Sequence, residues 1–120
     1  MSRLVLVADD DEDILALLAF RLEREGYDVL AARDGGQALA LTRERRPAVA
    51  VFDVAMPRLD GYEVTRAIRA KGLATQVVLL TARAGEDEVR RGLEAGADGY
   101  ITKPFSPAHL GWRLAELLRP

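Results

Sequence analysis

The sequence has no cysteine and a single histidine among its 120 residues. Without cysteine, the chain forms neither a disulfide framework nor a thiolate metal site, and nothing indicates an oxidising compartment. The longest apolar run, ILALLAF at residues 14–20, is far shorter than the ~20 residues that cross a bilayer. No signal-peptide pattern opens the chain. We therefore expect a cytoplasmic protein without a membrane partner.

Net charge is also low, because 17 basic side chains nearly balance 19 acidic ones to leave −2. This balance does not by itself indicate binding to nucleic acid. The length suits one domain, and the sequence shows no repeat, low-complexity segment or linker-like shift in composition. We expect a single domain over residues 1–120 with no output domain, so any contact with DNA would depend on a domain absent from this sequence.

Short β-branched runs alternate with amphipathic stretches along the chain, a pattern typical of α/β domains. The expected strands are residues 3–8, 27–32, 48–53, 76–81 and 98–102. We expect a helix after each strand, because apolar residues recur there every four positions. The recurring residues are Ile14, Leu18 and Leu22; Val64 and Ile68; Val89 and Leu93; Leu110 and Leu114.

Helix starts are marked by capping residues. Asp60 with Glu63 resembles a capping box, and Ser106 followed by Pro107 is typical of an N-cap with proline at the first helical position. Right-handed crossovers between these elements predict a doubly wound parallel sheet with helices on both faces. Ligands of such sheets bind beyond the carboxyl ends of the strands.

Polar side chains gather at those predicted strand ends. They are Asp9, Asp10, Asp53, Thr81 and Lys103. Each of these residues has an ordinary explanation when taken alone. For example, an aspartate before a helix often caps the helix, and we assign this capping role to Asp11. Neighbouring carboxylates raise the cost of ionising one another unless a cation offsets the repulsion. The joint placement therefore predicts a site for a metal ion beside Lys103.

The sequence resembles the receiver domains of two-component response regulators, chemotaxis-receiver-like, over essentially its whole length. The motifs that carry the resemblance are LVLVADDDEDI, VFDVAMPRLDGYEV, VVLLTAR and GLEAGADGYITKPF. It implies a flavodoxin-like, five-stranded parallel sheet with strand order 2-1-3-4-5. It also implies a phosphoacceptor domain that assists its own phosphotransfer and autodephosphorylation, and not a turnover enzyme.

By this resemblance, Asp53 is the phosphoacceptor, and Asp9 and Asp10 are the metal-binding pair. The metal would be held by Asp10, Asp53 and the backbone carbonyl of Ala55, with Asp9 contacting it through water. We expect Mg²⁺, for which Mn²⁺ can substitute, because a hard cation held by oxygen ligands neutralises charge in phosphoryl transfer.

The resemblance also assigns the readout of the phosphoryl group. Thr81 and Lys103 would bind the phosphoryl oxygens. Thr81 and Tyr100 would then relay the state to the face formed by the fourth helix, fifth strand and fifth helix, as a shift between two packed arrangements. Ala82, which is small, would leave room for the ring of Tyr100.

The implied phosphodonor is a phosphohistidine on a sensor histidine kinase or a histidine phosphotransfer protein. His109, the one histidine of the chain, lies on the last predicted helix and is expected on the surface. Trp112 projects away from the apolar face of that helix and is also expected to be exposed. A homodimer through the same face is expected as an alternative contact. The candidate partner residues are Arg90, Arg91, Glu94, Trp112 and Arg113.

Some positions depart from the family pattern. Ala55 and Arg83 occupy positions that tune the access of the hydrolytic water, so the dephosphorylation rate stays open. Gly99 and Ala115 differ from the residues usual in the DNA-binding subclass with winged-helix outputs, although Arg113 is present. The dimer of that subclass is therefore in doubt here.

Three other functions stay open. A haloacid dehalogenase-like phosphatase needs a second aspartate two residues after its nucleophile, where this chain has Ala55. A flavodoxin-like cofactor binder needs a phosphate-cradling loop in place of the aspartates after the first strand. A pseudo-receiver that only docks would not bind Mg²⁺. Turnover of a phosphomonoester would indicate the phosphatase, bound flavin would indicate the cofactor binder, and failure to bind Mg²⁺ would indicate the pseudo-receiver.

Overall fold

A computed structural model describes residues 3–82 and 85–118. Within these residues the chain forms one parallel sheet with strand order β2-β1-β3-β4-β5, which confirms the predicted architecture. The strands are β1 (Leu4–Ala8), β2 (Asp28–Ala32), β3 (Val49–Asp53), β4 (Gln76–Thr81) and β5 (Gly99–Thr102). Four of them begin one residue later than predicted, a difference within the usual uncertainty of element ends.

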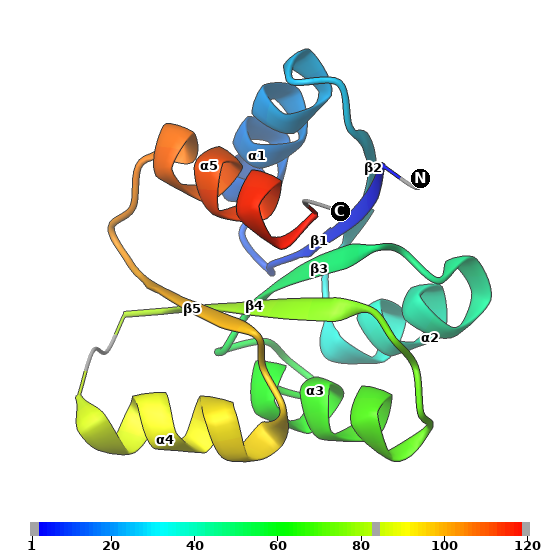
Figure 1. Ribbon diagram of the computed structural model, residues 1–120, viewed down its shortest axis with the longest axis vertical. Helices are drawn as coiled ribbons and strands as arrows, with labels where there is room; N and C mark the ends of the chain where they lie inside the picture. The colour runs from blue at the N-terminus through cyan, green and yellow to red at the C-terminus, as the bar shows by residue number, and fades with distance from the viewer. Residues whose placement is uncertain (1–2, 83–84, 119–120) are drawn as a thin grey trace.

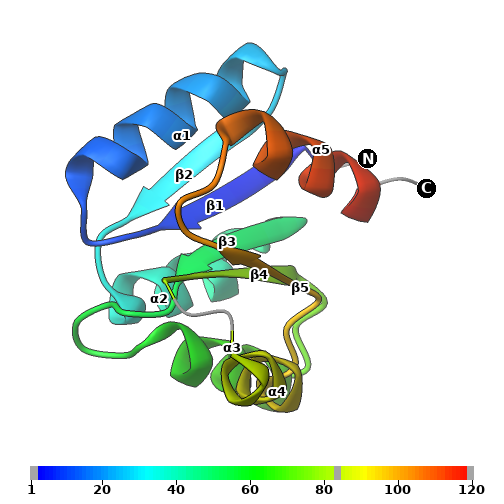
Figure 2. The same ribbon diagram turned by 90° about the vertical axis from the view of Figure 1, so that its left-hand side faces the viewer.

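Helices cover both faces of this sheet (Figures 1 and 2). They are α1 (Glu12–Arg24), α2 (Gly35–Arg45), α3 (Gly61–Ala70), α4 (Glu86–Ala95) and α5 (Pro107–Leu117). Figure 2 shows α1 and α5 on one face and α2, α3 and α4 on the other. None of these helices, as described, is long and apolar enough to cross a membrane.

The strands alternate between two cores, one on each face of the sheet. On β1, Val5 packs toward Leu18 of α1, whereas Leu6 belongs to the core that contains Ile68 of α3. Both faces of β1, β3 and β4 are buried, which is why these strands are apolar almost throughout. This double burial holds the strand ends in fixed positions.

The predicted helix starts are present. The Asp11 carboxylate accepts the backbone N–H of Asp13 at 2.9 Å. Asp60 and Glu63 form the reciprocal capping box, and the Ser106 hydroxyl accepts the N–H of His109. Each cap satisfies donors that the first turn of a helix leaves without partners.

The predicted buried face of α4 is wrong. Leu93 is 64% exposed and Val89 is half-buried, whereas Gly92 and Ala95 are fully buried. A Cβ atom at Gly92 would lie only 3.3 Å from the ring of Tyr100, so α4 approaches β5 through its small residues. Because neighbouring helical positions differ by about 100°, turning Gly92 inward turns Leu93 toward solvent.

Candidate functional site

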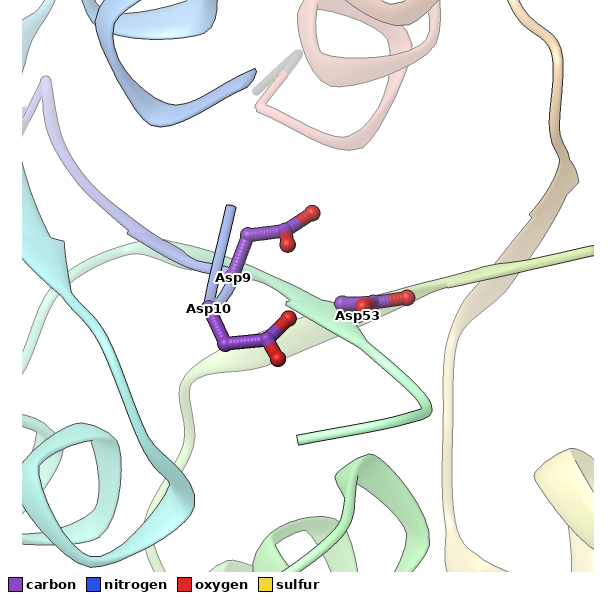
Figure 3. Close-up of side chains that lie close together, drawn as sticks. All are labelled: Asp9, Asp10 and Asp53. Carbon is purple, nitrogen blue, oxygen red and sulfur yellow. The ribbon is translucent and has the colours of Figure 1, made fainter. Parts of the chain in front are cut away.

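The carboxyl ends of β1 and β3 bring three carboxylates together. Asp9 and Asp10 follow β1, and Asp53 ends the neighbouring strand β3. One oxygen from each carboxylate lies within 4.8 Å of the other two, and Figure 3 shows the three side chains clustered there. Asp9 and Asp53 are buried, whereas Asp10 is exposed. The predicted acidic cluster is therefore formed, and its oxygen donors are of the kind that hard divalent cations prefer.

Lys103 reaches this cluster from the residue after β5. Its Nζ lies 3.0 Å from Asp53 Oδ1 and 3.3 Å from Asp9 Oδ2. Among the described residues, Lys103 is the basic side chain paired with these carboxylates. Three carboxylates beside one ammonium group leave the site with an excess of negative charge, which favours binding of a cation.

Burial acts in opposite ways on two of these groups. It raises the pKa of Asp9 above the ordinary value, and the charge of Asp53 adds to this, although the N–H of Asp11 and the ammonium of Lys103 lower it. Burial alone would lower the pKa of Lys103, but hydrogen bonds and charge from Asp53 and Asp9 outweigh burial and raise it. Lys103 is therefore held as a cation, while ionisation of Asp9 is costly.

Thr81 lines an open cavity of about 450 Å³ together with Asp53 and Lys103. Ala55 and Ala82 also line it, so the cavity brings together four of the predicted site residues: Asp53, Ala55, Thr81 and Lys103. Thr81 is buried at the end of β4, with its position set by pairing with Thr102 of β5. Arg83 lies outside the described residues.

Tyr100 is half-buried on β5, and its role as a switch residue with Thr81 stays a prediction. Its ring lies against Gly92 of α4 and belongs to the surroundings of the core on that face. Tyr100 thus connects β5 to α4, the helix whose buried face differs from the prediction.

The remaining predicted partner residues lie on α4 and α5. Trp112 is 61% exposed, as predicted, and stacks on the exposed ring of His109 at a centroid distance of 6.2 Å. Arg113 pairs with Glu116 at 3.3 Å. On α4, Arg90 pairs with Asp87, and Glu94 is exposed.

Among the residues of the cavity wall that were not predicted as site residues, two contact each other. Tyr62 of α3 donates a hydrogen bond from its hydroxyl to Glu88 Oε2 of α4 at 2.7 Å, and both residues line the cavity with Asp53. The sequence signal for Glu88 was the pair of small residues Gly92 and Ala95, because a stripe of small residues indicates a helix face that packs closely. Glu88 lies one turn from Gly92 on that face.

Comparisons with known proteins agree with this geometry. The family model described as "Response regulator receiver domain" matches residues 5–115. Among curated proteins, the chain is 44% identical over 119 residues to the alkaline phosphatase synthesis transcriptional regulatory protein PhoP of Bacillus subtilis. The match covers 99% of this chain and 50% of that protein, so the chain spans about half the length of this relative.

Solved structures show the same fold. The receiver domain of the Francisella response regulator 1452 matches with a TM-score of 0.91 and 38% identity, over 95% of this chain and 94% of that one. The Vibrio cholerae chemotaxis protein CheY4 matches with a TM-score of 0.92 and 32% identity, over 98% and 100% of the two chains. A receiver domain implies a phosphodonor partner such as a histidine kinase. The chain therefore belongs to the response regulator receiver domain family, whose members are phosphorylation-activated signalling domains of two-component systems and not turnover enzymes.

Proposed function

We propose that Asp53 is the phosphoacceptor and receives its phosphoryl group from a phosphohistidine of a sensor histidine kinase or a histidine phosphotransfer protein. The observation that carries this proposal is the contact of Lys103 Nζ with Asp53 Oδ1 at 3.0 Å, beside the clustered carboxylates. An ammonium group at this distance is placed to contact a phosphoryl group on the same carboxylate. The proposed location is the cytoplasm, where we expect the phosphohistidine donor to meet this domain.

The donor set fits a divalent cation. Asp10, Asp53 and the carbonyl of Ala55 would hold Mg²⁺, with Asp9 acting through water, and Mn²⁺ could take its place. Magnesium keeps several waters and binds through one or two carboxylates plus phosphate oxygens, which suits a cluster with one exposed and two buried carboxylates. Its chemistry here is to neutralise charge on the phosphoryl group.

In the proposed transfer, a carboxylate oxygen of Asp53 forms a bond to phosphorus while the bond from phosphorus to the donor imidazole breaks. The electron pair of the broken bond returns to the imidazole nitrogen. Lys103 and the hydroxyl of Thr81 hold the phosphoryl oxygens, so these residues act by positioning and by stabilising charge. Water later cleaves the acyl phosphate, and Ala55 and Arg83 tune the access of that water.

The readout is proposed to run from Thr81 and Tyr100 to α4, β5 and α5. This face carries the candidate residues for contact with a downstream partner or a second copy of the chain. They are Arg90, Arg91, Glu94, Trp112 and Arg113, of which Arg113 is half-buried. Phosphorylation would change the relative stability of two packed arrangements of this face.

Intact mass after incubation with Mg²⁺ and acetyl phosphate tests the proposal, with a phosphorylated histidine kinase as a second donor. Wild type is expected to gain one phosphoryl group, roughly 80 Da, and Asp53→Asn none, because the nucleophilic oxygen is lost while the side-chain shape is kept. Asp28→Asn, an exposed change on β2, is the matched control and should be labelled like wild type. Labelling of Asp53→Asn, or no labelling of wild type by either donor, would refute the proposal.

A further inference from the structure

Helix α4 is weakly anchored compared with α1 on the other face of the sheet. Its fully buried residues are the small Gly92 and Ala95, and its N-cap Gly85 has no side chain that could accept a hydrogen bond. By contrast, α1 buries three leucines, and Asp11 caps it. Burial of large apolar side chains supplies most of the free energy that fixes a helix on a sheet. The few polar contacts of α4 therefore matter more to its position.

In the first turn of α4 a polar contact with α3 joins Tyr62 to Glu88, while Arg69 of α3 donates to Gly96, the C-cap at the other end of α4. The Tyr62 hydroxyl donates to Glu88 Oε2 at 2.7 Å and lies 3.4 Å from the backbone carbonyl of the same residue. Tyr62 is 1% exposed, and the Glu88 side chain is 18% exposed. A hydrogen bond to a charged acceptor in such a shielded place is stronger than a neutral one on the surface.

Arg91 closes the contact from the other side. Its guanidinium carbon lies 4.5 Å from the centre of the Tyr62 ring, and its Nη1 lies 4.0 Å from Glu88 Oε1. Cation–π attraction and the charge of Glu88 both hold Arg91 there. The ring, carboxylate and guanidinium thus form one cluster between α3 and α4.

This cluster forms part of the wall of the phosphoryl-binding cavity. Tyr62, Glu88 and Arg91 line the same cavity as Asp53 and Lys103. A phosphoryl group on Asp53 adds negative charge to that cavity. The added charge repels the carboxylate of Glu88 and attracts Arg91, and both effects weaken the arrangement that holds Tyr62 to Glu88.

We propose that the Tyr62–Glu88 hydrogen bond, here called the latch, holds α4 against α3 and opposes occupation of the Asp53 site by a phosphoryl group. This inference rests on the proposed function and names a regulatory element of the same site. Tyr62 and Glu88 act as positioning residues, because they set how favourable it is to bind the group and do not take part in the transfer.

Thermodynamic coupling makes the proposal reciprocal. If the phosphoryl group weakens the latch, removing the latch must strengthen binding of a phosphoryl mimic by the same factor. Burial and the hydrogen bond to Glu88 raise the pKa of Tyr62, in keeping with a hydroxyl whose proton is held in this contact. The ring of Tyr100 lies against Gly92, one turn from Glu88, so a movement of α4 reaches the predicted switch residue.

Binding of beryllofluoride in the presence of Mg²⁺ tests the latch, with the bound resonance followed by ¹⁹F NMR. Tyr62→Phe removes only the hydroxyl and leaves every charge and the ring under Arg91 in place. We expect it to bind beryllofluoride about fivefold more tightly than wild type. Tyr27→Phe is the matched control, because Arg3 lies over that ring at the same 4.5 Å, and it should bind like wild type.

A double-mutant cycle separates the latch from general effects on the fold. In a Glu88→Ala background, Tyr62→Phe should have little further effect on affinity, because the carboxylate acceptor is already gone and only the longer contact with the backbone carbonyl of residue 88 is left. Two results would overturn the latch: Tyr62→Phe binds beryllofluoride no more tightly than wild type, or it gains as much affinity in the Glu88→Ala background as in wild type. In either case, binding of beryllofluoride by wild type would leave the proposed function standing. Failure of wild type to bind beryllofluoride would overturn the proposed function itself.

Discussion

Two ion-paired sites lie at opposite ends of the sheet, and they are built differently. Near the amino ends of β4 and β5, Arg69 Nη2 pairs with Asp98 Oδ2 at 2.7 Å. The same guanidinium also donates to the carbonyl oxygens of Gly96, Leu73 and Thr75 at 2.8–3.1 Å. The carboxylate in turn accepts the N–H of Val77 at 2.8 Å. At this site one cation pairs with one anion, and both groups also form hydrogen bonds with the backbone.

The carboxyl end of the sheet has the opposite balance. There, Lys103 pairs with Asp9 and Asp53 at 3.3 and 3.0 Å, and Asp10 adds a further carboxylate. An ion pair that serves stability is balanced and surrounded by hydrogen bonds, as at Arg69. A site that is left with excess charge is destabilised until a ligand arrives. The imbalance is therefore the physical sign that distinguishes the functional site from the structural one.

The largest effect is expected at the balanced site. Arg69→Ala removes four hydrogen bonds and leaves the Asp98 carboxylate without its cation. We expect the free energy of unfolding to fall by about 2–3 kcal/mol, a moderate value because both side chains are partly exposed. Urea denaturation, followed by circular dichroism, measures it.

Arg66→Ala is the control for this change, since Arg66 lies exposed on the same helix. It should alter stability by less than about 0.5 kcal/mol. An equal loss in the two variants would show that removal of a basic side chain from α3 in general, and not the Arg69 cluster, sets the cost.

Magnesium should act only on the unbalanced site. Millimolar Mg²⁺ is expected to raise the free energy of unfolding of wild type by about 1–3 kcal/mol, because the ion binds the folded cluster and not the unfolded chain. Arg69→Ala should show the same gain, since its site is remote from the carboxylates. A melting temperature that stays flat across the titration would contradict the assignment of the carboxylates as a metal site.

A smaller effect follows from Asp9. Because burial raises its pKa above the ordinary 3.8, the folded protein binds this proton more tightly than the unfolded chain does. Stability linked to Asp9 is therefore lost as the pH rises from 3.8 through the raised value. Asp9→Asn should stabilise the metal-free protein at pH 7, by less than about 1 kcal/mol because Lys103 loses one partner.

Urea denaturation in a chelating buffer measures this gain, which should shrink as the pH falls toward 4. Asp28→Asn, on the exposed edge strand, serves as the control and should change little at either pH. Destabilisation by Asp9→Asn at pH 7 would mean that the Lys103 pair outweighs the cost of burial.

The unbalanced site could be predicted from the sequence, because parallel strands bring their carboxyl ends to one edge. Asp53, Thr81 and Lys103 each lie at or just after the end of an apolar run, so their meeting did not depend on side-chain detail. The orientation of α4 could not be predicted in this way. Spacing by four placed Leu93 inward, but the close fit of Gly92 against Tyr100 turned it outward.

Contacts that join two helices were also beyond the sequence pattern. The Tyr62–Glu88 hydrogen bond depends on how far α3 and α4 lie apart, which is set by the small residues between α4 and the sheet. Likewise, Arg69 and Asp98 are 29 positions apart and meet only when α3 is packed beside β4 and β5. Such pairs follow from packing geometry and not from periodicity.

Direct mapping of the phosphoryl group tests the central claim most sharply. Wild type is incubated with Mg²⁺ and acetyl phosphate, reduced with borohydride to convert an aspartyl phosphate to homoserine, and sequenced by tandem mass spectrometry. The account predicts homoserine at position 53 and unmodified aspartate at Asp9 and Asp10. Homoserine at either of those two positions in place of Asp53 would contradict it.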